Sequence, residues 1–188
     1  NYQARKSVLE YDDVLNTQRK IIYAQRLQVL EGKDVKDSIM KMIDDTIAHA
    51  VHAAIGENHL ISLEMVEQAR RPFIGIFLRP DDCTFTAEEC DDLTAEQLTA
   101  ELAEQAHKVY DAKEQALTSP IMRELERVIL LKNVDSKWMD HIDAMTELRN
   151  GIGLRAYGQH DPVVEYKREG FDMFDAMIDS IREDTVRM

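Results

Sequence analysis

Histidines and cysteines are the side chains of this sequence whose spacing could serve chemistry directly. His49 and His52 lie three residues apart on an expected helix, a spacing that can bring two imidazoles to one metal ion. Two imidazoles alone are a weak ligand set, so no metal site is expected there. Cys83 and Cys90 are the two cysteines. Free thiols in a reducing compartment are favoured for them, and a disulfide across this short spacing is the alternative.

Other patterns with known chemistry are absent from the sequence. There is no Gly-x-x-x-x-Gly-Lys-Ser/Thr phosphate loop, and Gly151-x-Gly153 lacks both the third glycine and the preceding strand of a dinucleotide site. Adjacent acidic residues point about 100° apart on a helix, which does not make a catalytic dyad. Such pairs are Asp12-Asp13, Asp44-Asp45, Asp81-Asp82 and Asp91-Asp92. The chain is therefore expected to have no catalytic residue and to hold no cofactor, nucleotide or metal itself.

The stretch from Leu148 to Pro162 is where a contact with an outside partner is expected. Its glycines and its proline are poor in a helix interior, and Asp161-Pro162 is typical of a turn that leads into a new helix. The pattern predicts a helical hairpin whose tip, at about residues 151–161, displays an aromatic ring and a guanidinium. The candidate contact residues are Arg155, Ala156, Tyr157, Gly158 and Gln159.

Long helices must position this tip. The chain has 188 residues, is 44% hydrophobic and 31% charged, and contains only seven glycines and four prolines, which favours an all-α fold. Apolar residues repeat every seven positions from Val8 to Val29, which predicts one helix ending near Gly32. A further neighbouring stripe, Val14 and Ile21, indicates that this helix packs on more than one side, and Gln18 and Gln25 in the seam are polar contacts or exposed spacers.

Two more long helices are predicted after the middle of the chain. Ser119-Pro120 is expected to cap the first, with proline at its first helical position. Its apolar stripe is Ile121, Leu125, Val128, Leu131, Val134, Trp138, Ile142, Met145 and Leu148. Trp138 is interpreted as a structural core residue whose N–H is hydrogen-bonded. The returning helix has its stripe at Val163, Tyr166, Gly170, Phe174, Met177 and Ile181.

Shorter helices are predicted between them. Asp34 is expected to cap a helix that Gly56 ends, and Ser62 to begin a helix that Pro72 stops. The run 73–78 is expected to be a buried extended or helical piece. Two capping boxes are indicated, Thr86 with Glu89 and Thr94 with Gln97.

The net charge of −13 is concentrated in the middle of the chain. Residues 81–104 contain nine acids and no lysine or arginine, a pattern typical of a solvated face and opposed to nucleic-acid binding. No apolar run approaches the length of a membrane span, and no signal peptide opens the chain. The chain starts with Asn1 in what is already a helical pattern, so we expect it to be a segment of a longer protein.

Three stretches together resemble the SecA family of bacterial preprotein translocase motors. Residues 4–19 (ARKSVLEYDDVLNTQR) are similar to the start of its long scaffold helix, and residues 135–141 (DSKWMDH) to its tryptophan-bearing segment. Residues 148–169 are similar to its two-helix finger, with Ala156 where many members have glycine. The resemblance implies a scaffold helix at 1–32, a helical wing domain at 33–117 recognised by position only, and a second scaffold helix with the finger at 118–188.

The resemblance also implies a function. SecA motors hydrolyse ATP with magnesium and drive unfolded preproteins through the SecYEG channel, so the parent protein would be an ATPase whose motor domains lie outside this chain. Tyr157 corresponds to the tip tyrosine that contacts the translocating polypeptide. Implied partners are SecYEG, unfolded preprotein, the motor domains of the same chain and an acidic phospholipid surface, without nucleic acid. The implied location is the cytoplasm and the cytoplasmic face of the inner membrane. The alternative function is a non-enzymatic helical adaptor that binds a folded partner through the hairpin tip.

Overall fold

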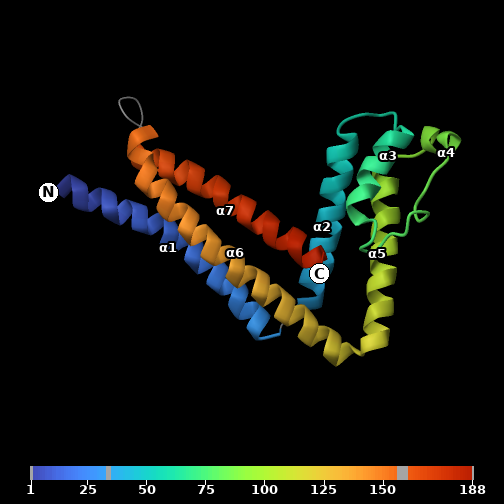
Figure 1. Ribbon diagram of the computed structural model, residues 1–188, viewed down its shortest axis with the longest axis horizontal. Coiled ribbons are helices and arrows are strands. Elements are labelled where there is room, and N and C mark those ends of the chain that lie inside the picture. Colours follow the sequence, from blue (N-terminus) through green and yellow to red (C-terminus); the bar gives the residue numbers. More distant parts are fainter. Residues whose placement is uncertain (1, 33–34, 156–160, 188) are drawn as a thin grey trace. The chain divides into compact units, whose positions relative to one another are not determined.

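The computed structural model describes residues 2–32, 35–155 and 161–187, and the side chains of 153–155 are not described. The described part is all-α, as predicted, and contains no named strand (Figure 1). The long helices are α1 (Tyr2–Leu30), α2 (Val35–Ile55), α5 (Ala95–Leu117), α6 (Ser119–Arg155) and α7 (Pro162–Arg187). The short ones are α3 (Leu63–Arg70), the 3₁₀ turn η1 (Arg71–Phe73) and α4 (Ala87–Asp91).

The chain divides into two compact units. The first unit contains residues 1–35 and 127–185, and the second contains residues 36–126 together with 186–188. The chain passes from one unit to the other at two points, here called crossings, which bound the main body of the second unit. One crossing lies between Val35 and Lys36, and the other lies between Glu126 and Arg127. Helix α6 is continuous through the latter crossing.

The first unit is built from α1, α7 and the greater part of α6. The heptad pattern of α1 is partly confirmed, because Ile22 and Val29 are buried while Val8 is 46% exposed. The second stripe is not fully covered within the described residues, since Ile21 is also exposed. One cluster of this core contains Met145, Ile152 and Tyr166, with Tyr11, Val14, Leu15, Leu148 and Met173 packed against it.

The stripe predicted for the start of α6 is wrong. Ile121 and Val128 are exposed, and the buried face instead carries polar residues between apolar ones. Its buried members are Met122, Glu126, Leu130, Asn133, Val134, Trp138, His141, Met145 and Ile152. Asn133 donates a hydrogen bond of 3.1 Å from Nδ2 to Oγ1 of Thr185 on α7. A pattern of apolar residues does not predict these buried polar positions, because a polar side chain can be buried when it has a hydrogen-bond partner.

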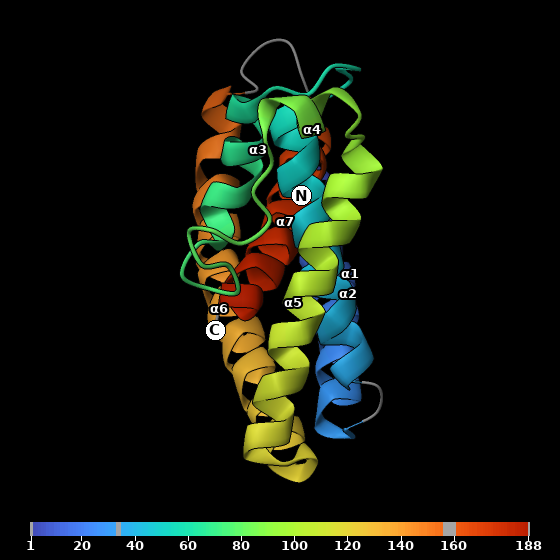
Figure 2. The same ribbon diagram turned by 90° about the vertical axis from the view of Figure 1, so that its right-hand side faces the viewer.

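The second unit has α2 and α5 side by side in both views (Figures 1 and 2). Their buried residues recur at intervals of four or eight positions, which places them on one face of each helix. They are Ile39, Ile43, Ile47, Val51 and Ile55 on α2 and Leu98, Leu102, Ala106 and Glu114 on α5. His107 of α5 also lies 2.7 Å from Asp44 of α2, measured from Nε2 to Oδ1.

Most predicted helix ends of the second unit are confirmed. Ser62 caps α3 by accepting from the backbone of Met65, and Thr94 forms a complete capping box with Gln97. Thr86 caps α4, but its hydroxyl, not its backbone, pairs with the carboxylate of Glu89, so only half of that box forms. The expected cap Asp34 lies outside the described residues. Gly56 ends α2 at a φ of +61°, where glycine avoids the strain of a Cβ.

The run 73–78 is a compact turn, with one isolated bridge between Ile74 and Leu78. Phe73 and Phe77 are buried and stack with ring centroids 4.9 Å apart. The side chain of Arg70, 1% exposed, reaches over to the following loop, where it donates to the carbonyl oxygens of Pro80 and Asp82. The prediction of a buried extended or helical piece is therefore only partly confirmed, because Phe73, Phe77 and Leu78 are buried but Ile74 and Ile76 are exposed and the run forms a turn.

Ser119 is the first residue of α6 and not its cap, which corrects the prediction. The flanking residue is Thr118, which accepts a bond from Met122 N at its carbonyl and joins α5 to α6. Thr118 has φ +77° and ψ 152°, a conformation that is strained for a β-branched side chain. The tight corner between α5 and α6 is thus made at the expense of backbone strain.

Candidate functional site: the α6–α7 hairpin and its seat on α1

Helices α6 and α7 form the predicted hairpin. Asp161 begins the return, because its Oδ1 accepts from Val163 N at 3.0 Å and its carbonyl accepts from Glu165 N. Pro162 is the first helical residue, where its missing N–H does no harm. The predicted turn into a new helix is confirmed for Asp161 and Pro162.

The predicted tip is only partly within the described residues. Helix α6 continues through Gly151 and Gly153 to Arg155, so the expectation that these glycines end the helix is wrong. A helical glycine costs about 1 kcal/mol relative to alanine, and burial of the intervening Ile152 side chain offsets a penalty of that size. The side chain of Arg155 is not described, and the contact candidates Ala156, Tyr157, Gly158 and Gln159 lie outside the described residues.

A buried polar contact seats the hairpin on α1. Gln18 is 6% exposed and donates from Nε2 to the carbonyl oxygen of Gly170 on α7 at 3.1 Å. Its Oε1 lies 2.6 Å from Nε2 of His141 on α6. An amide oxygen can only accept, so His141 Nε2 carries the proton and donates. One glutamine therefore binds both arms of the hairpin at once.

Burial lowers the pKa of His141 below its ordinary value, which favours the neutral imidazole. The ring lies beside that of Trp138 at 5.5 Å and that of Phe174 at 5.7 Å between centroids. The surroundings are thus mainly aromatic, and the proton of Nε2 is satisfied by Gln18.

Gly170 lets the three helices approach closely. A Cβ at this position would lie 2.7 Å from Cε and 3.2 Å from Sδ of Met145, and 3.7 Å from Cγ1 of Val14. Real Cβ atoms do not tolerate the first of these distances. A larger residue at this position would force the end of the fully buried Met145 side chain to move.

A second contact lies closer to the tip along the sequence. The rings of Tyr11 and Tyr166 meet edge to face, with centroids 5.0 Å apart and an interplanar angle of 86°. Arg149 of α6 lies over the Tyr11 ring with Cζ 5.0 Å from the centroid, and its Nη1 pairs with Asp12 at 3.0 Å. Cation–π and edge-to-face contacts add to the area that is buried. The hairpin is thereby fixed to α1 at two levels.

Trp138 lies in the same core and is 5% exposed. Its Nε1 is buried and has no hydrogen-bond partner in the described part of the chain. The expectation that this N–H is bonded is therefore wrong. The indole packs against the imidazole of His141. Nε2 of that imidazole donates its proton to Gln18, so Nε2 cannot accept from the indole N–H.

The histidines and cysteines of the second unit show no metal-binding arrangement in the described residues. Within residues 2–32, 35–152 and 161–187, no group of three or more histidine, cysteine or acidic side chains could hold a metal. His49 and His52 thus gain no further ligand there. Cys83 and Cys90 are free, and burial raises the pKa of both thiols, which makes them weak nucleophiles at neutral pH. Within the described chain, no helix combines the length and apolar character of a membrane span.

Residues 1–188 match the family described as SecA Wing and Scaffold domain. The chain belongs to the SecA family. Relatives called Protein translocase subunit SecA include those of Syntrophomonas wolfei, 45% identical over 194 residues, and Clostridium perfringens, 46% identical over 187 residues. A third, from Pelotomaculum thermopropionicum, is 46% identical over 191 residues. Each covers 100% of this chain, which spans only 21–22% of their length.

The sequence did not predict the full contact between α1 and the α6–α7 hairpin in this SecA segment. Gln18 stands out in the sequence as a polar residue in an apolar seam, but nothing in the sequence predicts that it contacts His141 and Gly170. The three residues come from three separate helices, and the glutamine in a heptad pattern of apolar residues is the one sequence feature that indicates the contact.

Proposed function

We propose that this chain is the scaffold, wing and finger segment of a protein translocase motor that moves unfolded preproteins through the SecYEG channel. The observation that carries the proposal is the double seat of the hairpin on α1, through Gln18 and through Tyr11. A pushing element must be stiff along its length. Two long helices held to a third at two levels meet that requirement, and the match to SecA relatives agrees with it.

The energy is proposed to come from outside this chain. ATP hydrolysis with magnesium would take place in motor domains of the same protein, which α1 would connect to the hairpin. The motor would work in the cytoplasm and at the cytoplasmic face of the inner membrane, next to acidic phospholipid. Residues 148–170 have four bases and three acids, so this segment is far less acidic than the stretch 81–104.

Tyr157 is the proposed contact with the moving polypeptide. Unfolded substrates differ in sequence, so a gripping residue cannot depend on specific hydrogen bonds. A tyrosine offers apolar area and a polar group while losing few rotamers. Arg155, Ala156, Gly158 and Gln159 would surround it at the tip.

The test is import of a preprotein into vesicles that contain the channel, with the ATPase rate followed in parallel, using the full-length protein. Tyr157→Ala should reduce import sharply, while Tyr157→Phe and Tyr157→Trp should keep most of it. Phe171→Ala is the matched control, because Phe171 is an aromatic residue of α7 that is 61% exposed and lies outside the tip. Full import by Tyr157→Ala would reject the gripping role. Retained import together with lost binding of one folded protein would favour the adaptor instead.

A further inference from the structure

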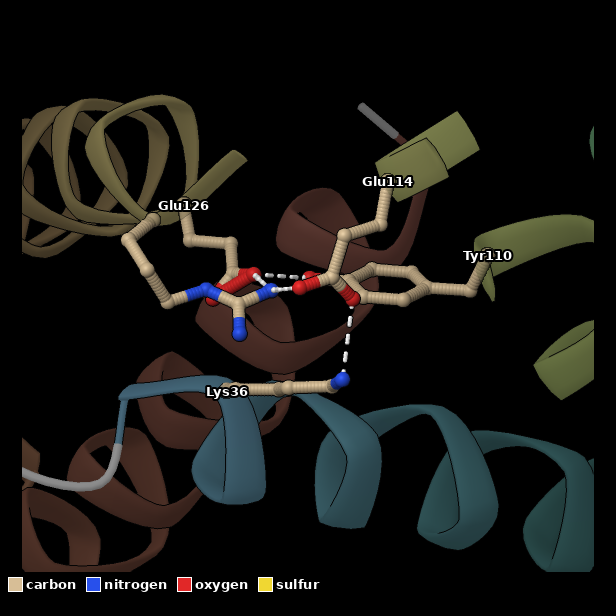
Figure 3. Close-up of polar contacts among 5 residues, drawn as sticks. Lys36, Tyr110, Glu114 and Glu126 are labelled. Atoms are coloured by element: carbon tan, nitrogen blue, oxygen red, sulfur yellow. Dashed lines mark hydrogen bonds and ion pairs between the residues drawn. The ribbon is translucent and has the colours of Figure 1, made fainter. Parts of the chain in front are cut away.

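A cluster of charged side chains lies in the second unit where α2, α5 and α6 meet (Figure 3). Its members are Lys36, Tyr110, Glu114, Arg123 and Glu126. Two acids and two bases cancel in net charge. The cluster takes part in no step of the transport function proposed above, and its buried charges need another explanation.

Glu114 of α5 is the centre of the cluster. Its Oε2 accepts from Nζ of Lys36 at 2.8 Å, and its Oε1 lies 3.0 Å from Nη2 of Arg123. Ser119 also donates to this carboxylate. The pKa of Glu114 is lowered, first of all by the bond from Lys36, so the group is ionised and can bind both cations at neutral pH. One carboxylate thus joins α2 to α6.

Glu126 is bound into the same cluster and is only 3% exposed. Its Oε1 accepts from the hydroxyl of Tyr110 and pairs with Nη2 of Arg123, at 2.5 Å in each case. Burial raises the pKa of Tyr110, so the phenol stays protonated and remains a donor. Tyr110 and Arg123 therefore hold Glu126, the last residue of α6 that belongs to the second unit, to α5.

The residues of this cluster lie at both boundaries of the second unit. Lys36 is the first residue of the second unit after one crossing, and Glu126 is the last residue before the next crossing. Both crossings are therefore tied to α5 through side chains that share Arg123 and Glu114. Between them lies the strained corner at Thr118, which is spanned by the hydrogen bond from Ser119 to Glu114 and by the ion pair between Arg123 and Glu114.

The cluster is poorly optimised for stability alone. Nε of Arg123 and Oε2 of Glu126 are buried without a hydrogen-bond partner in the part of the chain that the structure describes. Buried charges with incomplete partners are often less stabilising than apolar residues of similar volume, and their best-attested use is to specify one arrangement. This indicates a geometric role at the crossings.

We propose that this cluster is a clamp that holds both chain crossings to α5. Glu114 holds the α2 crossing through Lys36, and Glu114 and Tyr110 together hold the α6 crossing through Arg123 and Glu126. The second unit then behaves as one rigid body up to Lys36 and up to Glu126. Movement of this unit is confined to the two crossing points and does not spread into the first turns of α2 or α6. Loss of the Glu114 charge loosens both crossings together, although they are 90 residues apart in the sequence.

Hydrogen–deuterium exchange on the whole 188-residue chain tests the clamp. Glu114→Gln keeps the shape of the side chain and removes its charge. We expect amide exchange to rise about tenfold or more in residues 39–43 and in residues 122–127, as loss of charged hydrogen bonds predicts. Residues 98–106, in the middle of α5, should be unchanged. A rise at one crossing only, or at neither, would overturn the proposal.

Asp44→Asn is the matched control. It breaks the pair with His107, which also joins α2 to α5 at 2.7 Å but contains no residue of the cluster. Exchange at residues 122–127 should then stay as in the parent chain. An equal rise there in Asp44→Asn and Glu114→Gln would show general loosening of the unit and refute a clamp.

Lys36→Met is the milder variant, which decides the matter if Glu114→Gln fails to fold. Lys36 is 37% exposed at its side chain, so its methionine variant keeps the packing of the stem. Removal of this one partner leaves the contacts of Glu114 with Arg123 and of Glu126 with Tyr110 in place, so exchange should rise in residues 39–43 and stay unchanged in residues 122–127. An unchanged exchange rate in residues 39–43 would overturn the proposal.

Discussion

His141 donates a hydrogen bond from Nε2 to Gln18, which lies 123 positions away in the sequence, and Gln18 donates a second hydrogen bond to the carbonyl oxygen of Gly170. Nε2 carries the proton in the first of these bonds, and burial of the ring disfavours a second proton on Nδ1. The seat of the hairpin on α1 therefore depends on a side chain whose ordinary pKa is about 6.5.

The stability of the first unit should fall as the solution becomes acidic. Burial lowers the pKa of folded His141, so the unfolded chain takes up this proton at a higher pH than the folded chain does. The stability is fully present above about pH 6.5 and is lost as the pH falls through the folded-state pKa. Urea unfolding at pH 7.5 and pH 5.5 measures the difference.

The variant His141→Gln keeps a donor for Gln18 and removes the titration. Its loss of stability between the two pH values should be smaller than that of the parent chain. His49→Gln is the control, because His49 is exposed on α2. Equal acid sensitivity in the parent and in His141→Gln would contradict the assignment.

Gly170→Ala should destabilise the chain despite the higher helix propensity of alanine. The new Cβ would meet Cε of the fully buried Met145 at 2.7 Å, and overpacking of this kind costs about 1 to 3 kcal/mol, against about 1 kcal/mol gained in propensity. Thermal unfolding is the measurement. In a Met145→Ala background the same change should become neutral or stabilising, and an unchanged penalty there would show that the contact with Met145 is not its cause.

Arg70→Met should destabilise the second unit by about 3 kcal/mol, because two loop carbonyl oxygens lose their buried charged donor. The bonds lost are Nη2 to Pro80 O at 2.6 Å, Nε to Asp82 O at 3.0 Å and Nη1 to Oε2 of Glu67 at 2.6 Å. Limited proteolysis should then cut the loop 79–86 faster. Arg79→Met is the comparison, because Arg79 is 87% exposed at its side chain and should change stability by no more than about 0.5 kcal/mol. Similar effects of the two variants would argue against the role of Arg70.

Trp138 is the single tryptophan of the chain, so its emission reports on the α6 core directly. Emission should be blue-shifted in buffer and move to the red in urea. Trp138→Ala should cost about 3 to 5 kcal/mol, while Trp138→Phe should cost much less, since the indole N–H has no partner to lose. Emission at the value of exposed tryptophan in buffer would refute burial.

Helix periodicity and stop signals in the sequence were sufficient to predict most of the fold. Glycine at positive φ, as at Gly32 and Gly56, and proline at the first helical position, as at Pro162, act locally and can be read from a few neighbours. Gly151 and Gly153 misled the prediction because their own preference for a break is small, and packing of the helix in its tertiary context overrides it.

The contacts of the hairpin could not be predicted in the same way. Gln18, His141 and Gly170 are distant in sequence, and no local rule states that an amide will find an imidazole on another helix. The same holds for Glu114, whose burial depends on Lys36 and Arg123 arriving from two other helices. Polar residues on a buried face have no periodic signal that separates them from solvated ones.

The insertion of the second unit between the two parts of the first has a consequence for synthesis on the ribosome. Helix α1 is made early, but Ile22 and Gln18 obtain their neighbours only after the main body of the second unit, residues 36–126, has been translated. At about 5 to 20 residues per second this delay lasts roughly 5 to 20 s. The central body can fold during this time, whereas α1 waits with its apolar face open, and this is the interval in which a nascent chain of this architecture most needs protection from aggregation.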